Sequence, residues 1–501
     1  MKWEVTHIDE PNLSFGHGQK AQHPKDGLFL YGPPASNRNP ARMDVGVIGT
    51  PAGIELFKAW VRSIRSDIRA PDTGRLENKM MWPGFQAAFG IDWPEQPFVT
   101  CTIDAEKLGS RIRSSDRSEG IHSAVSVYEE TLRRHLVHEE ERPALWFVVV
   151  PEIVFKYGRP QSKVPKSEQV RSNAIGKREA NKMLTGGWLF PEDLKDAEIY
   201  KYEENFHNQL KARVLDTKQI LQVVRETTLA GGDLGETRRR LQDPASVAWN
   251  LSSTSFYKAG GTPWRIADVR DGVCYIGLVF KKMNIPGRTE NACCGAQMFL
   301  NTGEGVVFKG AVGPWLSEAD NSFHLGRAKA FELMEMIVGA YTDMHGKPPS
   351  ELFIHGKTWF DDDEWSGFME AVPEGTRLTG IRIRRQTEIK LFRFGKNPVL
   401  RGTAIITSSR SAYLWTTGFV PRLNTYPGRE VPNPITVDVV KGDVEIRTVL
   451  TDLMSLTKLN FNSASFGDGL PVTLRFADLV GEILTAAPLD ATPPLPFKAY
   501  I

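Results

Sequence analysis

The sequence predicts an α/β protein of two domains, and three observations lead to this prediction. Apolar runs at 44–49, 144–150 and 220–224 alternate with stretches of helical spacing, as in a Rossmann-like unit with a parallel sheet. The Gly- and Pro-rich segment KAGGTPW then interrupts this alternation. The elements that follow run in the order βββαβαβ before further helices, which is typical of a ribonuclease-H-like domain.

In the first part of the chain, DVGVIG, ALWFVVV and residues 220–224 are the expected strands. Helices are expected at 54–68 and 197–215. Acidic residues lie early in the second of these helices and basic residues late, which suits the helix macrodipole.

The second part begins with apolar segments at 272–280, 291–300 and 305–309, whose short connections predict a meander. The boundary lies near 265–272, so we expect one domain at 1–268, including an N-terminal lead-in segment, and another at 269–501. The remaining expected elements are helices at 324–343, from about 363, at 449–456 and at 472–485, and strands at 352–355, 403–407, 411–416 and 436–440.

Composition excludes several classes of protein. The chain has 62 Lys and Arg against 60 Asp and Glu, so its net charge of +2 predicts no polyanionic partner by itself. Four cysteines without a CxxC pair argue against a disulfide framework or zinc finger and favour a reducing cytoplasm. The N-terminus has no signal pattern, and no apolar run approaches the ~18 residues of a membrane span. We therefore expect a cytoplasmic protein without membrane contact.

One candidate site combines His207 and Lys211, which the i, i+4 spacing places on one helix face. Gln222 follows on the next expected strand, and Lys258 opens the KAGG turn. Two ammonium groups, an imidazole and an amide suit a terminal phosphate. On spacing alone, a solvated amphipathic helix with an unrelated Gln and Lys explains the pattern at least as well.

A second candidate is the basic stretch 377–401, which contains eight Lys or Arg residues and only one acid, Glu388. The alternation IRIRR places Arg382 and Arg384 on one strand face, with Arg385 next to them. Together with the neighbouring Phe392 and Phe394, the three arginines could contact a nucleic-acid backbone. The alternative is a charged edge strand that prevents aggregation.

Two further patterns are interpreted structurally. The four acids at 361–364 precede a helical stretch, so they are expected to cap it and not to bind a metal. Cys293 and Cys294 are expected to pack inside a strand. No phosphate-binding loop, nucleophile elbow or zincin motif is present in the sequence.

The segments EPNLSFGHG, DGLFLYGP, WFVVVPEIVFKYGRP and, most specifically, LTKLNFNSASFGDGLPVTLRFADLVGEIL resemble the MID and PIWI halves of Argonautes. The resemblance covers nearly the whole chain and points to the short prokaryotic Argonautes, which lack N and PAZ domains. The segments GVCYIGLVFKK, NACCGAQMFL and TPPLPFKAYI are similar to the branch that pairs with a separate TIR-APAZ protein, the SPARTA systems.

The resemblance assigns a role to the first candidate site. It implies that His207, Lys211, Gln222 and Lys258 bind the 5′-phosphate of a guide, with His207 where the family usually has Tyr. It also implies a non-catalytic Mg²⁺ at the guide 5′ end, held by Gln222 and the C-terminal carboxylate of Ile501.

The resemblance also implies that the catalytic carboxylate tetrad is degenerate. Leu278 and Lys357 stand at two of the acid positions, and only Asp478 keeps an acid. One carboxylate cannot hold the two metal ions that cleavage requires. We therefore expect no catalytic residues, no target cleavage and no enzymatic activity of this chain alone.

The expected function is the sensing role in antiviral and anti-plasmid defence. The chain would bind a guide RNA, pair it with single-stranded target DNA and activate the NADase of a TIR-APAZ partner in a heterodimer that forms a higher oligomer on target binding. Two alternatives stay open: a guide-directed nuclease, and the same sensor with a sirtuin-like or nuclease effector.

Overall fold

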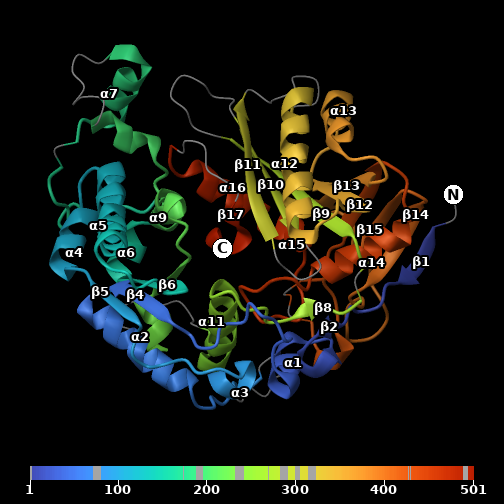
Figure 1. Ribbon diagram of the computed structural model, residues 1–501, viewed down its shortest axis with the longest axis horizontal. Helices are drawn as coiled ribbons and strands as arrows, with labels where there is room; N and C mark the ends of the chain where they lie inside the picture. The colour runs from blue at the N-terminus through green and yellow to red at the C-terminus, as the bar shows by residue number, and fades with distance from the viewer. Residues whose placement is uncertain are drawn as a thin grey trace.

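The computed structural model describes residues 3–71, 80–172, 174–187, 196–231, 242–268, 270–282, 292–299, 305–313, 323–426, 428, 430–488 and 495–501. Two main sheets organise these residues, one in the blue-to-green part of the chain and one mostly in the yellow-to-red part, which the blue strand β1 joins (Figure 1). Helix α11 (Pro244–Lys258) lies between them. The predicted α/β class is confirmed.

The first sheet is four-stranded, entirely parallel and ordered β5-β4-β6-β7. Helix α2 (Pro51–Ile64) packs on one face, while α5 (Arg117–His138) and α9 (Phe206–Val214) share a separate buried cluster on the other. This two-sided cover confirms the Rossmann-like unit. The strands are β4 (Val45–Gly49), β5 (Val99–Thr102), β6 (Leu145–Val150) and β7 (Leu221–Arg225).

The second sheet has ten strands, and its centre has the order β11-β10-β9-β12-β13. The first three of these form the predicted antiparallel meander, while β12 and β13 run parallel to β9. This arrangement confirms the ribonuclease-H-like fold. The strands are β9 (Val273–Lys282), β10 (Ala292–Phe299), β11 (Gly305–Gly313), β12 (Glu351–Gly356) and β13 (Arg377–Arg385).

Helices cover both faces of this second sheet. Residues of α12 (Arg327–His345) and α13 (Asp362–Ala371) form one buried cluster with alternate strand residues. Residues of α14 (Ile446–Leu456), α15 (Val472–Arg475) and α16 (Ala477–Thr485) pack on the other face. Asp361 accepts a hydrogen bond from the Glu364 amide at 2.7 Å, so the acidic run caps α13 as predicted.

The N-terminal segment crosses to the second sheet. Strand β1 (Glu4–His7) pairs antiparallel with β14 (Thr403–Ser408), although the sequence placed this segment with the first domain. The sheet is completed by β15 (Ser411–Leu414), β16 (Ile435–Lys441) and β17 (Leu495–Pro496), and a small sheet combines β2 (Leu13–Ser14), β3 (Lys20–Ala21) and β8 (Arg265–Ile266).

Two predicted helices differ from the structure. The helix expected at 197–215 is only a 3₁₀ turn at Ile199–Lys201 followed by α9, because Asn205 caps a new helix by accepting from the amides of His207 and Asn208. The helix expected at 472–485 is interrupted at Phe476, between α15 and α16. Helices α5 and α11 were not predicted as elements.

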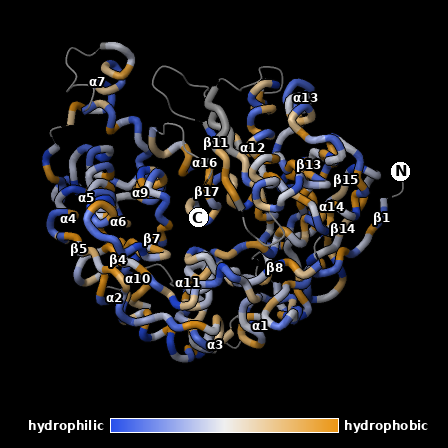
Figure 2. The backbone as a smooth tube through the Cα atoms, viewed as in Figure 1, coloured by the Kyte–Doolittle hydropathy of each residue, from blue (hydrophilic) through white to orange (hydrophobic). Residues whose placement is uncertain are grey.

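One continuous apolar core includes residues from both sheets, with Trp249 and Phe256 of α11 between them. In Figure 2, hydrophobic and hydrophilic residues alternate along the surrounding helices, as amphipathic packing requires. Among the described residues, no helix is both long and apolar enough to span a bilayer. Cys101 and Cys274 are free thiols, while the side chains of Cys293 and Cys294 lie outside the described part.

Candidate functional site

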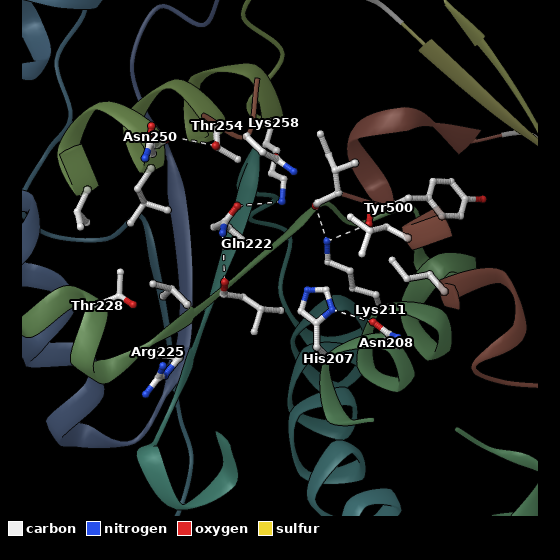
Figure 3. Close-up of a pocket in the computed structure, with 18 of the residues that line it drawn as sticks. His207, Asn208, Lys211, Gln222, Arg225, Thr228, Asn250, Thr254, Lys258 and Tyr500 are labelled. Atoms are coloured by element: carbon white, nitrogen blue, oxygen red, sulfur yellow. Dashed lines mark hydrogen bonds between the residues drawn. The ribbon is translucent and has the colours of Figure 1, made fainter. Parts of the chain in front are cut away.

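A cavity of about 470 Å³ lies where the two sheets' helices meet, and four predicted residues line it. Helix α9 contributes His207 and Lys211, β7 contributes Gln222, and Lys258 ends α11 (Figure 3). The chain's last residues and α16 close the cavity from the second domain. The structure thus brings together residues that lie up to 51 positions apart. The alternative that Gln222 and Lys258 are unrelated to the helix of His207 and Lys211 is therefore wrong.

Lys211 joins the first domain to the end of the chain. Its ammonium donates hydrogen bonds to the main-chain oxygens of Tyr500, at 3.2 Å, and Ile501. Lys211 is only 2% exposed, so this charge has little contact with water. Its position one helical turn after His207 follows from the Asn205 cap, which sets where α9 begins.

Lys258 also lines the cavity and is 1% exposed. Its ammonium donates to the Leu221 carbonyl at 3.0 Å and to Gln222 Oε1 at 2.9 Å. Lys258 is therefore held by oxygens of β7, and Gln222 is oriented by Lys258.

The electrostatics of this cavity favour an anion. Burial lowers the pKa of Lys211 to about 7 and lowers the pKa of Lys258 well below 10.5, with a further contribution from Lys211. An incoming anion would favour the charged lysines and so offset the cost of burying them.

Sequence reasoning missed two further contributors. Asn208 is buried beside His207, with its Oδ1 3.1 Å from the imidazole Nδ1. The carbonyl of Tyr500 orients Lys211. Asn208 lies next to His207 in the first turn of α9, and this adjacency could have identified it from the sequence. No local sequence pattern links Tyr500 to Lys211.

The oxygens expected to hold Mg²⁺ line the same cavity. Gln222 Oε1 and the main-chain oxygen of Ile501 are hard donors of the type Mg²⁺ prefers, and each already accepts from a lysine. No group of three His, Cys, Asp or Glu residues suited to a metal occurs among the residues the structure describes. Because an ammonium already lies against each of the two oxygens, a Mg²⁺ at this site stays a prediction.

Two of the positions that the sequence assigned to a degenerate tetrad, Lys357 and Asp478, meet at the surface. Lys357 directly follows β12, and its ammonium lies 2.8 Å and 3.0 Å from the two carboxylate oxygens of Asp478 on α16. Both side chains are at least half exposed. An ammonium therefore lies against the one acid that the sequence retains at these positions.

Leu278 does not join this pair. It packs in the apolar cluster with Leu333 of α12, whereas the neighbouring Gly277 faces the main chain of α15 at Thr473. Leu278 thus lies on the opposite face of the sheet from Asp478. Counting from Gly277, the pattern GxD places its acid at Val279 and not at Leu278, and neither residue is a carboxylate.

The arginines of the basic stretch differ in how far they are exposed to solvent. Arg384 and Arg385 are exposed at the end of β13 and have no ion pair among the described residues. Arg382, in contrast, is 9% exposed, pairs with Asp438 at 2.7 Å and stacks on Trp359. The prediction that Arg382 is available to a nucleic-acid backbone is therefore wrong, because its charge is already compensated inside the fold.

Comparison with protein-family models gives no match, and neither does comparison with curated proteins. Solved structures do match. A structure of Clostridium butyricum Argonaute bound to a guide DNA and a 19-mer target DNA is 17% identical, with a TM-score of 0.62, over 98% of this chain and 54% of that chain. A crystal structure of A. aeolicus Argonaute is 15% identical, with a TM-score of 0.54, over 98% and 54%. The chain thus spans about half the length of these structures and has the fold of that part of an Argonaute.

Proposed function

We propose that this chain is the guide-binding, target-sensing subunit of a short prokaryotic Argonaute system. It binds a 5′-phosphorylated guide RNA, pairs the guide with single-stranded target DNA and activates a separate TIR-APAZ NADase without cutting the target. The convergence of Lys211, Lys258, His207 and Gln222 on one cavity carries this proposal.

The phosphate is the ligand that this cavity suits best. Two buried ammonium groups supply charge-assisted hydrogen bonds, which are about twice as strong as neutral ones. When Mg²⁺ is bound, Gln222 and the carboxyl group of Ile501 would hold it, and the ion would neutralise neighbouring guide phosphates. Base pairing would then read the target sequence while the protein holds the duplex by its backbone.

The Lys357–Asp478 pair supports the absence of cleavage. A two-metal site needs several carboxylates around two cations, and a lysine ammonium repels a metal ion. The output would therefore come from the partner, whose active sites become competent in an assembly that duplex formation favours.

The first prediction tests this division of labour. Guide-loaded protein with labelled matched target and Mg²⁺ should give no cleavage product, and the chain alone should consume no NAD. Addition of a TIR-APAZ partner should start NAD hydrolysis with matched target and not with mismatched target. Specific cleavage within the duplex, or NAD turnover that ignores complementarity, would contradict the proposal.

The second prediction concerns Arg384 and Arg385 as groups that bind the nucleic-acid backbone. Replacing both with Ala should weaken target capture equally for all sequences, because phosphate interactions carry no base information. The slope of log affinity against log salt should shrink by about 0.7–0.9 for each phosphate that the variant no longer neutralises. Arg377→Ala is the matched control, since Arg377 lies at the other end of β13 and pairs with Glu351. An unchanged slope in the double variant would mean that the two arginines do not contact phosphates and only form a solvated strand end.

A further inference from the structure

A buried amide connects the cavity's imidazole to two carboxylates. Asn208 is 4% exposed, and its Oδ1 lies 3.1 Å from His207 Nδ1. Its Nδ2 lies 3.4 Å and 3.2 Å from the two carboxylate oxygens of Glu203 and 3.4 Å from Glu482 Oε2. Glu203 precedes α9 and Glu482 belongs to α16, so this amide also joins the two domains.

The charges around the amide determine its orientation. Lys281 Nζ lies 3.2 Å from Glu482 Oε1 and forms an ion pair with that carboxylate. An ionised carboxylate only accepts hydrogen bonds, so the NH₂ group of Asn208 must face it. The carbonyl oxygen of Asn208 is then left for the imidazole. Because a carbonyl oxygen also only accepts, His207 Nδ1 must carry the hydrogen.

We propose that Asn208, fixed by Glu203 and Glu482, is a positioning residue that keeps His207 in the Nδ1–H tautomer and leaves Nε2 as a hydrogen-bond acceptor for the ligand. Nε2 has no hydrogen-bond partner among the described residues, and the imidazole is exposed at the cavity. The nearby ammonium of Lys211, one helical turn away, disfavours a second positive charge on the ring.

This tautomer gives the residues of the cavity different roles in binding the ligand. A neutral nitrogen with a lone pair repels a phosphate dianion. In this proposal Lys211 and Lys258 therefore bind the phosphate, whereas His207, which the resemblance assigns to the phosphate, binds another part of the same nucleotide. The Nε2 atom instead suits an N–H or O–H donor of the nucleotide that carries the phosphate, on its base or ribose. The identity of that ligand rests on the proposed function, whereas the tautomer does not.

The tautomer can be measured without any guide. In protein labelled with ¹⁵N-histidine, long-range ¹H–¹⁵N correlation spectra distinguish the two neutral tautomers, and His207→Gln identifies the signal. We expect Nδ1–H in the unchanged protein and a shift to Nε2–H in Asn208→Leu. Asn205→Ser, which keeps a helix-capping side chain, is the control and should leave the tautomer unchanged. An Nε2–H ring in the unchanged protein, or no change in Asn208→Leu, would overturn the proposal.

Guide binding gives the second measurement. Asn208→Leu should weaken binding of a 5′-phosphorylated RNA about two- to tenfold, the usual size of one net hydrogen bond. In a His207→Phe background the same substitution should have no further effect, because Asn208 acts through the imidazole. An equal loss in both backgrounds would make Asn208 a structural residue and overturn its positioning role. A protein that binds no guide yet shows the Nδ1–H tautomer would instead overturn the proposed function alone.

Discussion

Replacing Lys211 or Lys258 with Met should lower affinity for a 5′-phosphorylated guide RNA about ten- to a hundredfold. Affinity for the same guide with a 5′-hydroxyl should barely change. Each ammonium is almost fully buried and is held by main-chain and amide oxygens, so it can add a charge-assisted contact of roughly 1.5–3 kcal/mol to a phosphate. Met keeps the length and the apolar stem of Lys, so the charge is removed without opening a large cavity.

The control is Lys218→Met, which removes an exposed charge shortly after α9 and outside the cavity. It should affect the two guides equally and weakly. Fluorescence anisotropy with both guides measures the ratio directly. An equal loss for both guides in the Lys211 and Lys258 variants would mean that these lysines serve the fold or bind the guide backbone in general.

The preference for a 5′-phosphate should also depend on pH. Burial lowers the pKa of Lys211 to about 7, so the free protein holds this lysine largely neutral above that pH. A bound phosphate favours the charged form, and binding therefore takes up a proton. The preference should grow as pH falls from about 9 to about 7 and level off below, where Lys211 is already charged and the phosphate begins to protonate near pH 6.

The sequence allowed the residues of the cavity to be predicted, but not their arrangement. The i, i+4 spacing was sufficient to pair His207 with Lys211, because helical geometry is local. The hydrogen bond from Lys258 to Gln222 depends on how α11 packs beside β7, and no rule of sequence spacing predicts that packing. The contact of Lys211 with Ile501 joins residues 290 positions apart and was not predicted; the resemblance implied only that Ile501 belongs to the same site.

Ion pairing inside the fold explains where residue-type arguments failed. Arg382 and Arg401 belong to a basic stretch that the sequence assigned to nucleic acid, yet both are buried and ion-paired. Charge density along a chain does not reveal which cations already have partners. Asp438 and Glu10, the two acids that pair with these arginines, lie 56 and 391 positions away.

The buried ion cluster around Glu10 makes this N-terminal residue structurally important. Arg401 Nε lies 2.9 Å from Glu10 Oε2, and the ammonium of Lys458 contacts Glu10 Oε1. The side chains of Arg401 and Lys458 are 4% and 0% exposed, respectively. Burial lowers the pKa of Lys458 to about 7, and the carboxylate of Glu10 opposes that shift. Two buried cations therefore depend on one carboxylate.

Glu10→Ala should destabilise the protein by about 3–5 kcal/mol, because it removes the carboxylate that pairs with both buried cations. Glu4→Ala is the matched control: Glu4 lies on β1 and pairs with Arg447, but both side chains are largely exposed, so its loss should cost at most about 1 kcal/mol. Urea denaturation of both variants measures the difference. The loss in Glu10→Ala should be largest below pH 7, where Lys458 must stay charged in the folded state, and smaller above it, where Lys458 can release its proton while Arg401 cannot. Equal, small losses in the two variants would show that the carbonyl groups around Arg401 and Lys458 suffice to hold their charges.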